Sequence, residues 1–228
     1  ENADAFCLNV CTVKGDSTAL QLLRKIQNAN SSAPILLTGC IPPDFEQKLL
    51  LENSNVSLAN LDVLRKNPDL LNEWLKGNGF RENLKEKTPR IFTPGMAQES
   101  PHIGILNISD GCLDACSFCS TRLVKGKHRS VSPEKILSEA KRYLENGCKE
   151  LWLTGQDTSC YGFDIGTNLA ELAKKILEQN SGDYKIRLGM GNPRHLEKYL
   201  NEMLSVYEDD RIYKFIHLPV QSGSDPVL

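Results

Sequence analysis

The feature that most constrains the fold is the alternation of short apolar runs with stretches of helical period. In the N-terminal third, the apolar runs are DAFCLNV (4–10), PILLTGC (34–40) and NVSLA (55–59). A helix signal follows the first run, where Asp16 or Ser17 is placed to cap a stripe of leucine and isoleucine. This order predicts an α/β fold with a parallel sheet of the flavodoxin or Rossmann type.

The second half of the chain repeats the pattern. Its predicted strands are HIGILNIS (102–109), ELWLT (150–154), KIRLGM (185–190) and IYKFIHLPV (212–220). Between them, Ser132, Thr167 and Asn192 are predicted to precede or cap helices. Repeated strand–helix steps with short loops indicate a partial (β/α) barrel, truncated after about four strands.

A polar segment separates the two halves. Residues 80–100, FRENLKEKTPRIFTPGMAQES, contain two prolines and a glycine and show no regular period. We therefore predict an N-terminal domain at 1–80, a linker at 81–100 and a second domain at 101–228. Because the chain starts without Met and stops in a predicted loop, we expect it to be a fragment.

The composition excludes several classes of protein. Of the 228 residues, 40% are hydrophobic and 25% are charged, and the net charge is −2. No apolar run has the length of a membrane span, and no signal peptide is visible, so a cytoplasmic protein is expected. Eight cysteines in a chain of this size indicate metal binding more than a secreted disulfide scaffold.

Three of these cysteines are clustered in CLDACSFC (112–119). Cys112, Cys116 and Cys119 offer three thiolates, which suit a soft metal or an iron–sulfur cluster, whereas structural zinc takes four ligands. A cluster held by three thiolates keeps one iron open for a small molecule. The triplet directly follows a predicted strand, at the end of a barrel where catalysis takes place. A zinc-binding loop is the alternative interpretation.

Two further cysteines end neighbouring predicted strands. Cys11 and Cys40 are expected at the carboxyl edge of the N-terminal sheet, which indicates a second metal or cluster site with one ligand still lacking. Cys7 is roughly 13 Å from Cys11 along an extended strand, so we expect it to pack inside the sheet instead. We place the missing ligand upstream of the chain and interpret Cys148 and Cys160 as structural.

Together these residues resemble the radical-SAM methylthiotransferases. The resemblance rests on CxxxCxxC with Phe118, on the CTV and TGC motifs, and on three longer stretches typical of the archaeal and eukaryotic branch: WLTGQDTSCYGFDIGTNL, RLGMGNP and HLPVQSGSD. That branch converts N6-threonylcarbamoyladenosine beside the tRNA anticodon, at position 37, into its 2-methylthio derivative. The chain departs from the family in lacking the first auxiliary cysteine and the C-terminal TRAM domain.

The resemblance implies two [4Fe-4S] clusters and S-adenosylmethionine as cofactors. It places the radical-SAM cluster on Cys112, Cys116 and Cys119, and an auxiliary cluster on Cys11, Cys40 and a cysteine outside the sequence. It also implies the tRNA anticodon loop as substrate and an electron donor such as a flavodoxin or ferredoxin. No catalytic acid or base is identified.

Several residues near predicted strand ends are candidates for binding S-adenosylmethionine. They are Gly155, Gln156, Asp157, Arg187, His217 and Gln221. For the first three, a plain turn is an equally good interpretation. Arg187 suits the carboxylate of the cofactor or a structural salt bridge, and the last two rest on position alone.

A basic run comes directly after the cysteine triplet. It consists of Arg122, Lys125, Lys127, His128 and Arg129. It suits contact with RNA phosphates, or it forms a solvated loop. Two other functions stay open: a methylthiotransferase acting on a ribosomal protein, and a zinc-stapled RNA-binding module.

Overall fold

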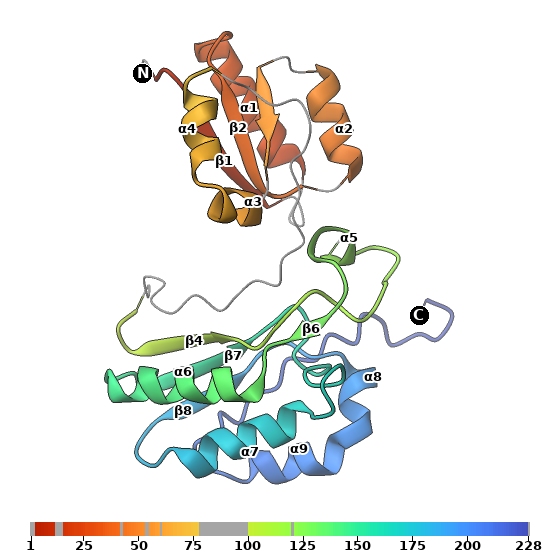
Figure 1. Cartoon of the computed structure of the whole chain (residues 1–228). Coiled ribbons are helices and arrows are strands. Elements are labelled where there is room, and N and C mark those ends of the chain that lie inside the picture. The colour runs from red at the N-terminus through yellow and green to blue at the C-terminus, as the bar shows by residue number, and fades with distance from the viewer. Residues whose placement is uncertain are drawn as a thin grey trace. The chain divides into compact units, whose positions relative to one another are not determined.

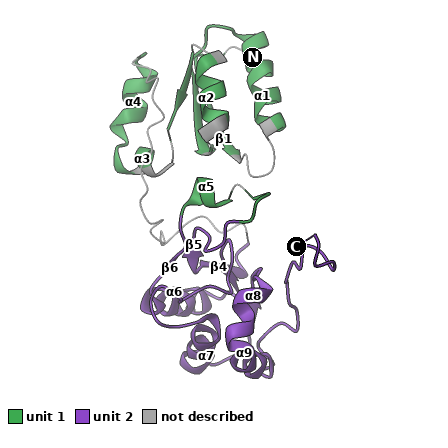
Figure 2. Cartoon of the chain, turned by 90° about the vertical axis from the view of Figure 1, so that its right-hand side faces the viewer, with its two compact units in different colours: residues 1–90, 116–126 green, residues 91–115, 127–228 purple. Residues whose placement is uncertain are grey.

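The computed structural model describes residues 3–11, 16–41, 43–52, 55–59, 61–77, 100–119 and 121–227. The chain forms two compact units (Figure 2). The first comprises Glu1–Arg90 with Cys116–Gly126, and the second comprises Ile91–Ala115 with Lys127–Leu228. The predicted linker lies outside the described residues except at Ser100, so the domain limits stay a prediction.

The first unit contains a parallel sheet in the order β1-β2-β3, as the sequence predicts (Figure 1). Its elements are β1 (Phe6–Cys11), α1 (Asp16–Ala29), β2 (Ile35–Cys40), α2 (Pro43–Glu52), β3 (Val56–Leu58), α3 (Leu61–Lys66), α4 (Asp69–Leu75) and, from the second segment, α5 (Thr121–Lys125). Each of the expected strands in this unit is therefore present, within one or two residues of its predicted limits.

This sheet lies between two layers of helices. Ile35 and Leu37 of β2 pack in one core with Leu23 of α1, while Leu36 packs with Trp74 of α4 in another. The alternation follows from the two-residue period of a strand, which points successive side chains to opposite faces. Both faces are thus covered, as expected for a parallel sheet.

One expectation for this unit is wrong. Cys7 does not pack inside the sheet but is exposed. Strand β1 is an edge strand, and its residues Phe6, Leu8 and Val10 supply the face that packs on the core. Successive side chains of a strand point to opposite faces, so the side chain of Cys7 points away from that core.

The second unit has a parallel sheet in the order β4-β7-β8 and a small antiparallel pair, β5-β6. Its elements are β4 (Ile103–Asn107), β5 (Ser109–Asp110), β6 (Arg129–Ser130), α6 (Pro133–Glu145), β7 (Glu150–Thr154), α7 (Leu169–Gln179), β8 (Lys185–Leu188), α8 (Pro193–Leu196), a 3₁₀ turn (Glu197–Tyr199) and α9 (Leu200–Tyr207). The parallel α/β pattern predicted for this half is confirmed.

The two faces of this sheet differ. Helices α6, α7 and α9 cover one face (Figure 1), where Leu106, Leu153 and Leu188 are buried in a single core. The residues between them in the strands, such as Ile105 and Trp152, are less buried, and Ile105 is 47% exposed. The face opposite the helices is therefore the more exposed one.

The predicted strand at 212–220 is wrong beyond its first residue. Ile212 forms one isolated parallel bridge with Ile186, and the described residues after it are not in a strand. Phe215, Ile216 and Val220 are 47%, 54% and 64% exposed. Strand propensity depends largely on packing against neighbouring side chains. Exposed apolar residues such as these therefore gain little stability from forming a β-strand.

The cap of α7 is also displaced by one residue from the prediction. Asn168, not Thr167, is the N-cap, and its side chain accepts a hydrogen bond from the amide of Glu171. Thr167 donates its hydroxyl to the Glu171 carboxylate at 2.6 Å instead. Ser132 precedes α6 as predicted, with Pro133 at the first helical position, although its side chain makes no capping bond.

Among the described residues, no helix has both the length and the apolar character that crossing a bilayer requires.

Candidate functional site

The loop that carries Cys112 is held at its start. Strand β5 ends at Asp110, and Cys112 then forms a single parallel bridge with Lys127. Between Asp110 and Cys112, the amide of Gly111 donates to Oε1 of Gln156 at 2.8 Å. Gln156, a predicted cofactor-binding residue after β7, thus fixes the backbone directly before Cys112.

Cys116 and Cys119 lie in the segment grouped with the first unit. The amide of Cys119 donates to the carbonyl of Cys116 at 3.0 Å, which closes a turn around Ser117 and Phe118. Cys116 is exposed, Cys112 and Cys119 are partly exposed, and none of the three is in a disulfide. Three closely spaced cysteine sulfurs that are not paired with one another are a donor set that fits an iron–sulfur cluster.

Cys11 and Cys40 are the last residues of β1 and β2 and are register partners on these strands. Adjacent strands lie about 4.8 Å apart, so the two backbones are neighbours at the carboxyl edge of the sheet. Gly39 permits this arrangement. Its φ is +105°, and a Cβ there would lie 2.2 Å from the carbonyl oxygen of Val10, so a side chain has no room.

The residues predicted after β7 hold loops together. A Cβ on Gly155 would lie 2.7 Å from Oγ of Ser109, so the glycine lets this strand end approach β5. Gln156 accepts the hydrogen bond of the Gly111 amide. Asp157 is only 3% exposed and its carboxylate is occupied by protein donors. In this structure the carboxylate of Asp157 bonds to protein groups, and its assignment to cofactor binding stays a prediction.

Asp157 connects two loops. Its Oδ1 accepts hydrogen bonds from the amide and hydroxyl of Ser159 and from the amide of Asn192. Its Oδ2 accepts one from Nδ1 of His195 at 2.8 Å. Burial raises the pKa of this carboxyl, but the bonds from Ser159 and His195 outweigh burial and lower the pKa below its usual value. The carboxylate is thus ionised and satisfied in the folded chain.

Arg187 lies on the less buried face of the sheet. Its guanidinium is 5.1 Å from the ring centre of Trp152, its register partner on β7, and 5.3 Å from that of Phe215. Cation–π contacts orient a guanidinium without neutralising it. No salt bridge to Arg187 is present in the described part of the chain, so the alternative of a structural ion pair is not realised there.

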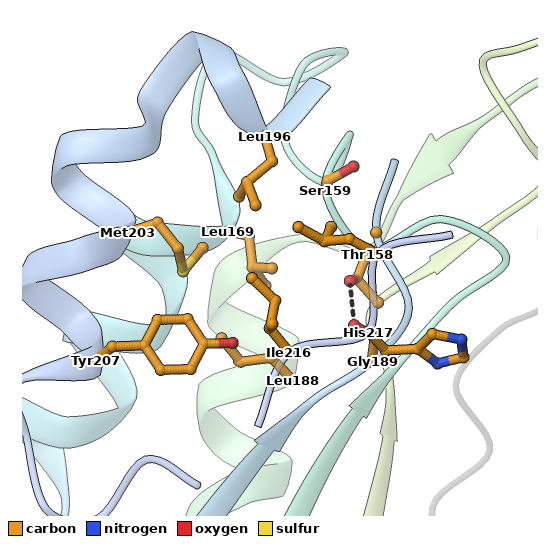
Figure 3. Close-up of a pocket in the computed structure, with 12 residues that line it drawn as sticks. Thr158, Ser159, Leu169, Leu188, Gly189, Leu196, Met203, Tyr207, Ile216 and His217 are labelled. Atoms are coloured by element: carbon orange, nitrogen blue, oxygen red, sulfur yellow. Dashed lines mark hydrogen bonds between the residues drawn. The ribbon is translucent and has the colours of Figure 1, made fainter. Parts of the chain in front are cut away.

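His217 borders a small apolar cavity of about 20 Å³ near the end of β8 (Figure 3). Leu169, Leu196 and Met203 line it, and Thr158 donates its hydroxyl to the carbonyl of Gly189 at 3.2 Å. The imidazole of His217 points away from these apolar side chains (Figure 3). A volume of this size holds about one water, so the cavity is a packing gap and not a cofactor pocket.

Gln221 is exposed and has a φ of +65°, the only left-handed value at a non-glycine residue in the described ranges. Such a conformation is strained for a side chain of this kind. The amide of Ser222 donates to the carbonyl of Val220 at 2.7 Å, which makes a tight turn around it. The assignment of Gln221 to cofactor binding stays a prediction.

The basic run is wrong at one position. His128 is 7% exposed, with Nδ1 at 3.3 Å from the sulfur of Cys160 and Nε2 at 3.1 Å from Oγ of Ser130. Burial lowers its pKa. His128 therefore belongs to the interior, whereas its neighbours Lys127 and Arg129 are exposed.

Sequence reasoning missed Asp114 and its partners. The Asp114 carboxylate, inside the cysteine loop, accepts hydrogen bonds from the Asn192 amide and the Arg194 guanidinium. Nε2 of His195 lies 3.6 Å from the same carboxylate. Since these partners are 78 and 80 residues from Asp114 in the chain, no local pattern announces them. The loop between Cys112 and Cys116 is thus fastened to the start of α8.

The chain is similar to known proteins over its whole length. The sequence profile of the radical SAM superfamily matches residues 106–228. The whole chain is 36% identical to a probable threonylcarbamoyladenosine tRNA methylthiotransferase of Pyrococcus horikoshii, covering 53% of that protein. It is 34% identical to the threonylcarbamoyladenosine tRNA methylthiotransferase of Homo sapiens, covering 40% of it. The chain thus spans about half the length of such relatives.

Among solved structures, the chain is similar to the radical S-adenosylmethionine methyltransferase TsrM of Kitasatospora setae. The TM-score is 0.60 at 11% identity, and the match covers all of this chain and 50% of TsrM. This similarity concerns the fold alone. Because the superfamily profile covers more than half of the chain, and the cysteine loop lies within the matched residues, the chain belongs to the radical SAM superfamily.

Proposed function

We propose that the protein is a tRNA methylthiotransferase. It adds a methylthio group to C2 of N6-threonylcarbamoyladenosine at position 37 by radical S-adenosylmethionine chemistry. The observation that carries this proposal is the CxxxCxxC loop after β5, in a chain that is 32–36% identical over its whole length to relatives with that name.

The proposed division of labour follows the two sheets. Residues 1–80 hold the auxiliary cluster, 81–100 connect, and 101–228 form the radical-SAM core, a partial barrel. Cys112, Cys116 and Cys119 hold one [4Fe-4S] cluster, and Cys11 and Cys40 supply two thiolates to the other. The register of Cys11 with Cys40 supports the second assignment, because it makes two thiol-bearing residues neighbours on adjacent strands.

When bound, the clusters and S-adenosylmethionine supply the one-electron cleavage, the radical and the sulfur of the reaction. The chain's own residues position these groups. Gln156 fixes the backbone before Cys112 through the amide of Gly111. Arg187, oriented by Trp152 and Phe215 on the less buried face, binds the carboxylate of the cofactor. Asp157 acts indirectly, through the loops that it joins.

Gly155, His217 and Gln221 complete the proposed cofactor surface. Gly155 directly follows β7, and its lack of a side chain lets this strand end lie close to Ser109. The imidazole of His217 turns away from the core, and Gln221 is exposed. The side chains of His217 and Gln221 are therefore available to a ligand. Their proposed role in cofactor binding is based on their position in the chain after the β-bridge at Ile212.

The proposed partners are the tRNA anticodon loop and a small electron-transfer protein such as a flavodoxin or ferredoxin, in the cytoplasm. Arg122, Lys125, Lys127 and Arg129 suit contact with the RNA phosphates, since Lys127 and Arg129 are exposed and the other two are partly exposed. An anticodon loop presents unstacked bases, which a protein reads more easily than paired ones.

The first test measures metal and colour. The chain is purified without oxygen, reconstituted with iron and sulfide, and compared with the triple variant Cys112, Cys116, Cys119→Ala. We expect about four irons per chain in the first cluster, lost in the triple variant. Zinc in place of iron at these cysteines would support the zinc-stapled RNA-binding alternative and overturn the radical mechanism.

The second test identifies the substrate. Full-length protein, reduced and supplied with S-adenosylmethionine, is incubated with tRNA that carries threonylcarbamoyladenosine, and the digested nucleosides are weighed by mass spectrometry. We expect the 2-methylthio product. A parallel reaction with ribosomal protein distinguishes the other methylthiotransferase activity, and product only in that arm would contradict the tRNA assignment.

A further inference from the structure

A buried group of metal-ligating side chains lies outside the residues proposed for the clusters. Asp157 and Cys160 are in the loop after β7, and His195 is in α8. One ligand atom from each of the three lies within 4.8 Å of the others. Their exposed fractions are 3%, 0% and 3%. Buried ionisable groups gathered this closely normally pair with one another or coordinate a metal.

A second histidine borders this group. Nδ1 of His128 is 3.3 Å from the sulfur of Cys160. Its other nitrogen, Nε2, is 3.1 Å from Oγ of Ser130 and 3.7 Å from the carboxylate of Asp164. One ring nitrogen thus faces the cysteine, and the opposite nitrogen faces a hydroxyl and a carboxylate.

His195 has the same arrangement. Its Nδ1 faces Asp157 at 2.8 Å, and its Nε2 is 3.6 Å from the carboxylate of Asp114. Histidines that bind metals commonly direct their second nitrogen to a carboxylate, which fixes the ring and its tautomer. Both histidines here have that outer partner in place.

We propose that Asp157, Cys160 and His195 form a binding site for one zinc ion, distinct from the iron–sulfur ligands, with His128 beside the sulfur of Cys160. One sulfur, one imidazole nitrogen and one carboxylate oxygen are three ligands that zinc accepts in tetrahedral geometry, with water as the fourth. A thiolate, a carboxylate and a divalent cation sum to zero charge, which suits a buried site.

The protons balance. Burial raises the pKa of the Cys160 thiol, so without metal the sulfur carries its proton, and zinc binding releases that proton to solvent. The proton of His195 that now points to Asp157 moves to Nε2, beside Asp114. The ion replaces the hydrogen bond between Asp157 and His195 with two coordinate bonds and joins the loop after β7 to α8.

The test separates this site from the clusters. The five cysteines proposed to hold iron, at positions 11, 40, 112, 116 and 119, are replaced by serine in the full chain. Cobalt(II) is then titrated as a spectroscopic probe and displaced by zinc. We expect about one ion per chain, with a thiolate-to-cobalt absorption band and the d–d bands of a tetrahedral ion.

Two variants are compared in that background. Cys160→Ser should remove the thiolate band and weaken zinc binding on the order of tenfold or more, because a ligand is lost. Cys148→Ser is the matched control: Cys148 is also buried in the second unit, with its sulfur 3.6 Å from the carbonyl of Pro101, and lies outside the group. It should leave binding and spectrum unchanged.

The same comparison is also made in the chain that keeps all its other cysteines, in case the five serine substitutions prevent folding. There, the difference in cobalt absorption and zinc binding between the parent and Cys160→Ser reports on this site. In the serine background, a thiolate band or zinc affinity that survives Cys160→Ser would overturn the proposal, as would the absence of tight binding in its parent. In the chain with all its cysteines, an identical band and stoichiometry with and without Cys160→Ser would overturn it. In the serine background, zinc should also raise the melting temperature of the parent and not that of Cys160→Ser. None of these outcomes bears on the methylthiotransferase proposal.

Discussion

The two sheets of the chain position their cysteines in different ways. In β1-β2-β3, Cys11 and Cys40 are strand residues, and the register of the backbone alone makes them neighbours. In the second unit, Cys112 opens a loop, and side chains from the loop after β7 and from α8 hold the residues on either side of it, Gly111 and Asp114. Both sheets are parallel and have three strands.

The two arrangements depend on different kinds of contact. A strand end is fixed by many ladder hydrogen bonds, so it tolerates the loss of any one side-chain contact. A loop depends on a few specific polar contacts, and the loss of one leaves buried partners unsatisfied. Backbone changes should therefore be most damaging in the first sheet, and polar side-chain changes in the second.

The largest effect is expected for Gly39→Val. Its φ of +105° and the contact of 2.2 Å with the Val10 carbonyl leave no place for a side chain. We expect a loss of about 3 kcal/mol in the free energy of unfolding of the first unit, measured by urea denaturation. Gly77→Ala is the control, because Gly77 has a φ of +94° but nothing within 4 Å. An equal loss in both variants would contradict the packing argument.

The second effect is expected for Asp114→Ala. Removing this carboxylate leaves the side chains of Asn192 and Arg194 without their partner in the cysteine loop. We expect a loss of about 2 kcal/mol, with faster amide exchange in residues 112–115. Glu145→Ala, which removes only the exposed pair with Lys141, should change stability by less than about 0.5 kcal/mol. Unchanged exchange in the loop would refute its dependence on Asp114.

A smaller effect is expected at the start of α7. Asn168→Ala removes the acceptor of the Glu171 amide and should cost about 1 kcal/mol of stability. Ser132→Ala at the start of α6 is the matched change, because Ser132 makes no side-chain capping bond, and it should cost less. Thermal melting of the two variants under one condition compares them, and equal losses would contradict the cap assignment.

The smallest effect concerns acid stability. Hydrogen bonds from Arg211 lower the pKa of Asp209 to about 2, from a usual 3.8. A depressed carboxyl pKa stabilises the fold above pH 3.8, and this contribution is lost as the pH falls toward 2. Because the pair is partly exposed, we expect only about 0.5 kcal/mol. Asp209→Asn should flatten this part of the stability curve. An identical pH profile for the variant would show that the pair contributes nothing.

Much of the fold follows from local pattern. The apolar run ELWLT is β7 to the residue, and SPEKIL begins α6 with Pro133 at the first position. Such features depend on the spacing of neighbouring residues, which the chain alone displays. The CxxxCxxC spacing belongs to the same class, because it is a property of eight consecutive residues.

The prediction for 212–220 failed for the opposite reason. IYKFIHLPV has the composition of a strand, but a strand also requires a partner and a covered face, and the described structure supplies one bridge at Ile212. Whether a segment forms a strand depends on the residues that pack against it as much as on its own sequence. Cys7 illustrates the same point, because the face on which it lies was decided by which side of β1 packs on the core.

The sequence by itself determined where strands and helices begin, and which cysteines are close enough along the chain to act together. Only the tertiary structure decided that His128 is interior, that Asp157 accepts hydrogen bonds from Ser159, Asn192 and His195, and that Cys160 lies beside two histidines. The physical reason is distance along the chain. Apart from the bond to Ser159, the hydrogen bonds of Asp157 and the contact of His128 with Cys160 join residues 32 to 38 positions apart. Their energies depend on burial, which arises only when the sheet and its helices have packed.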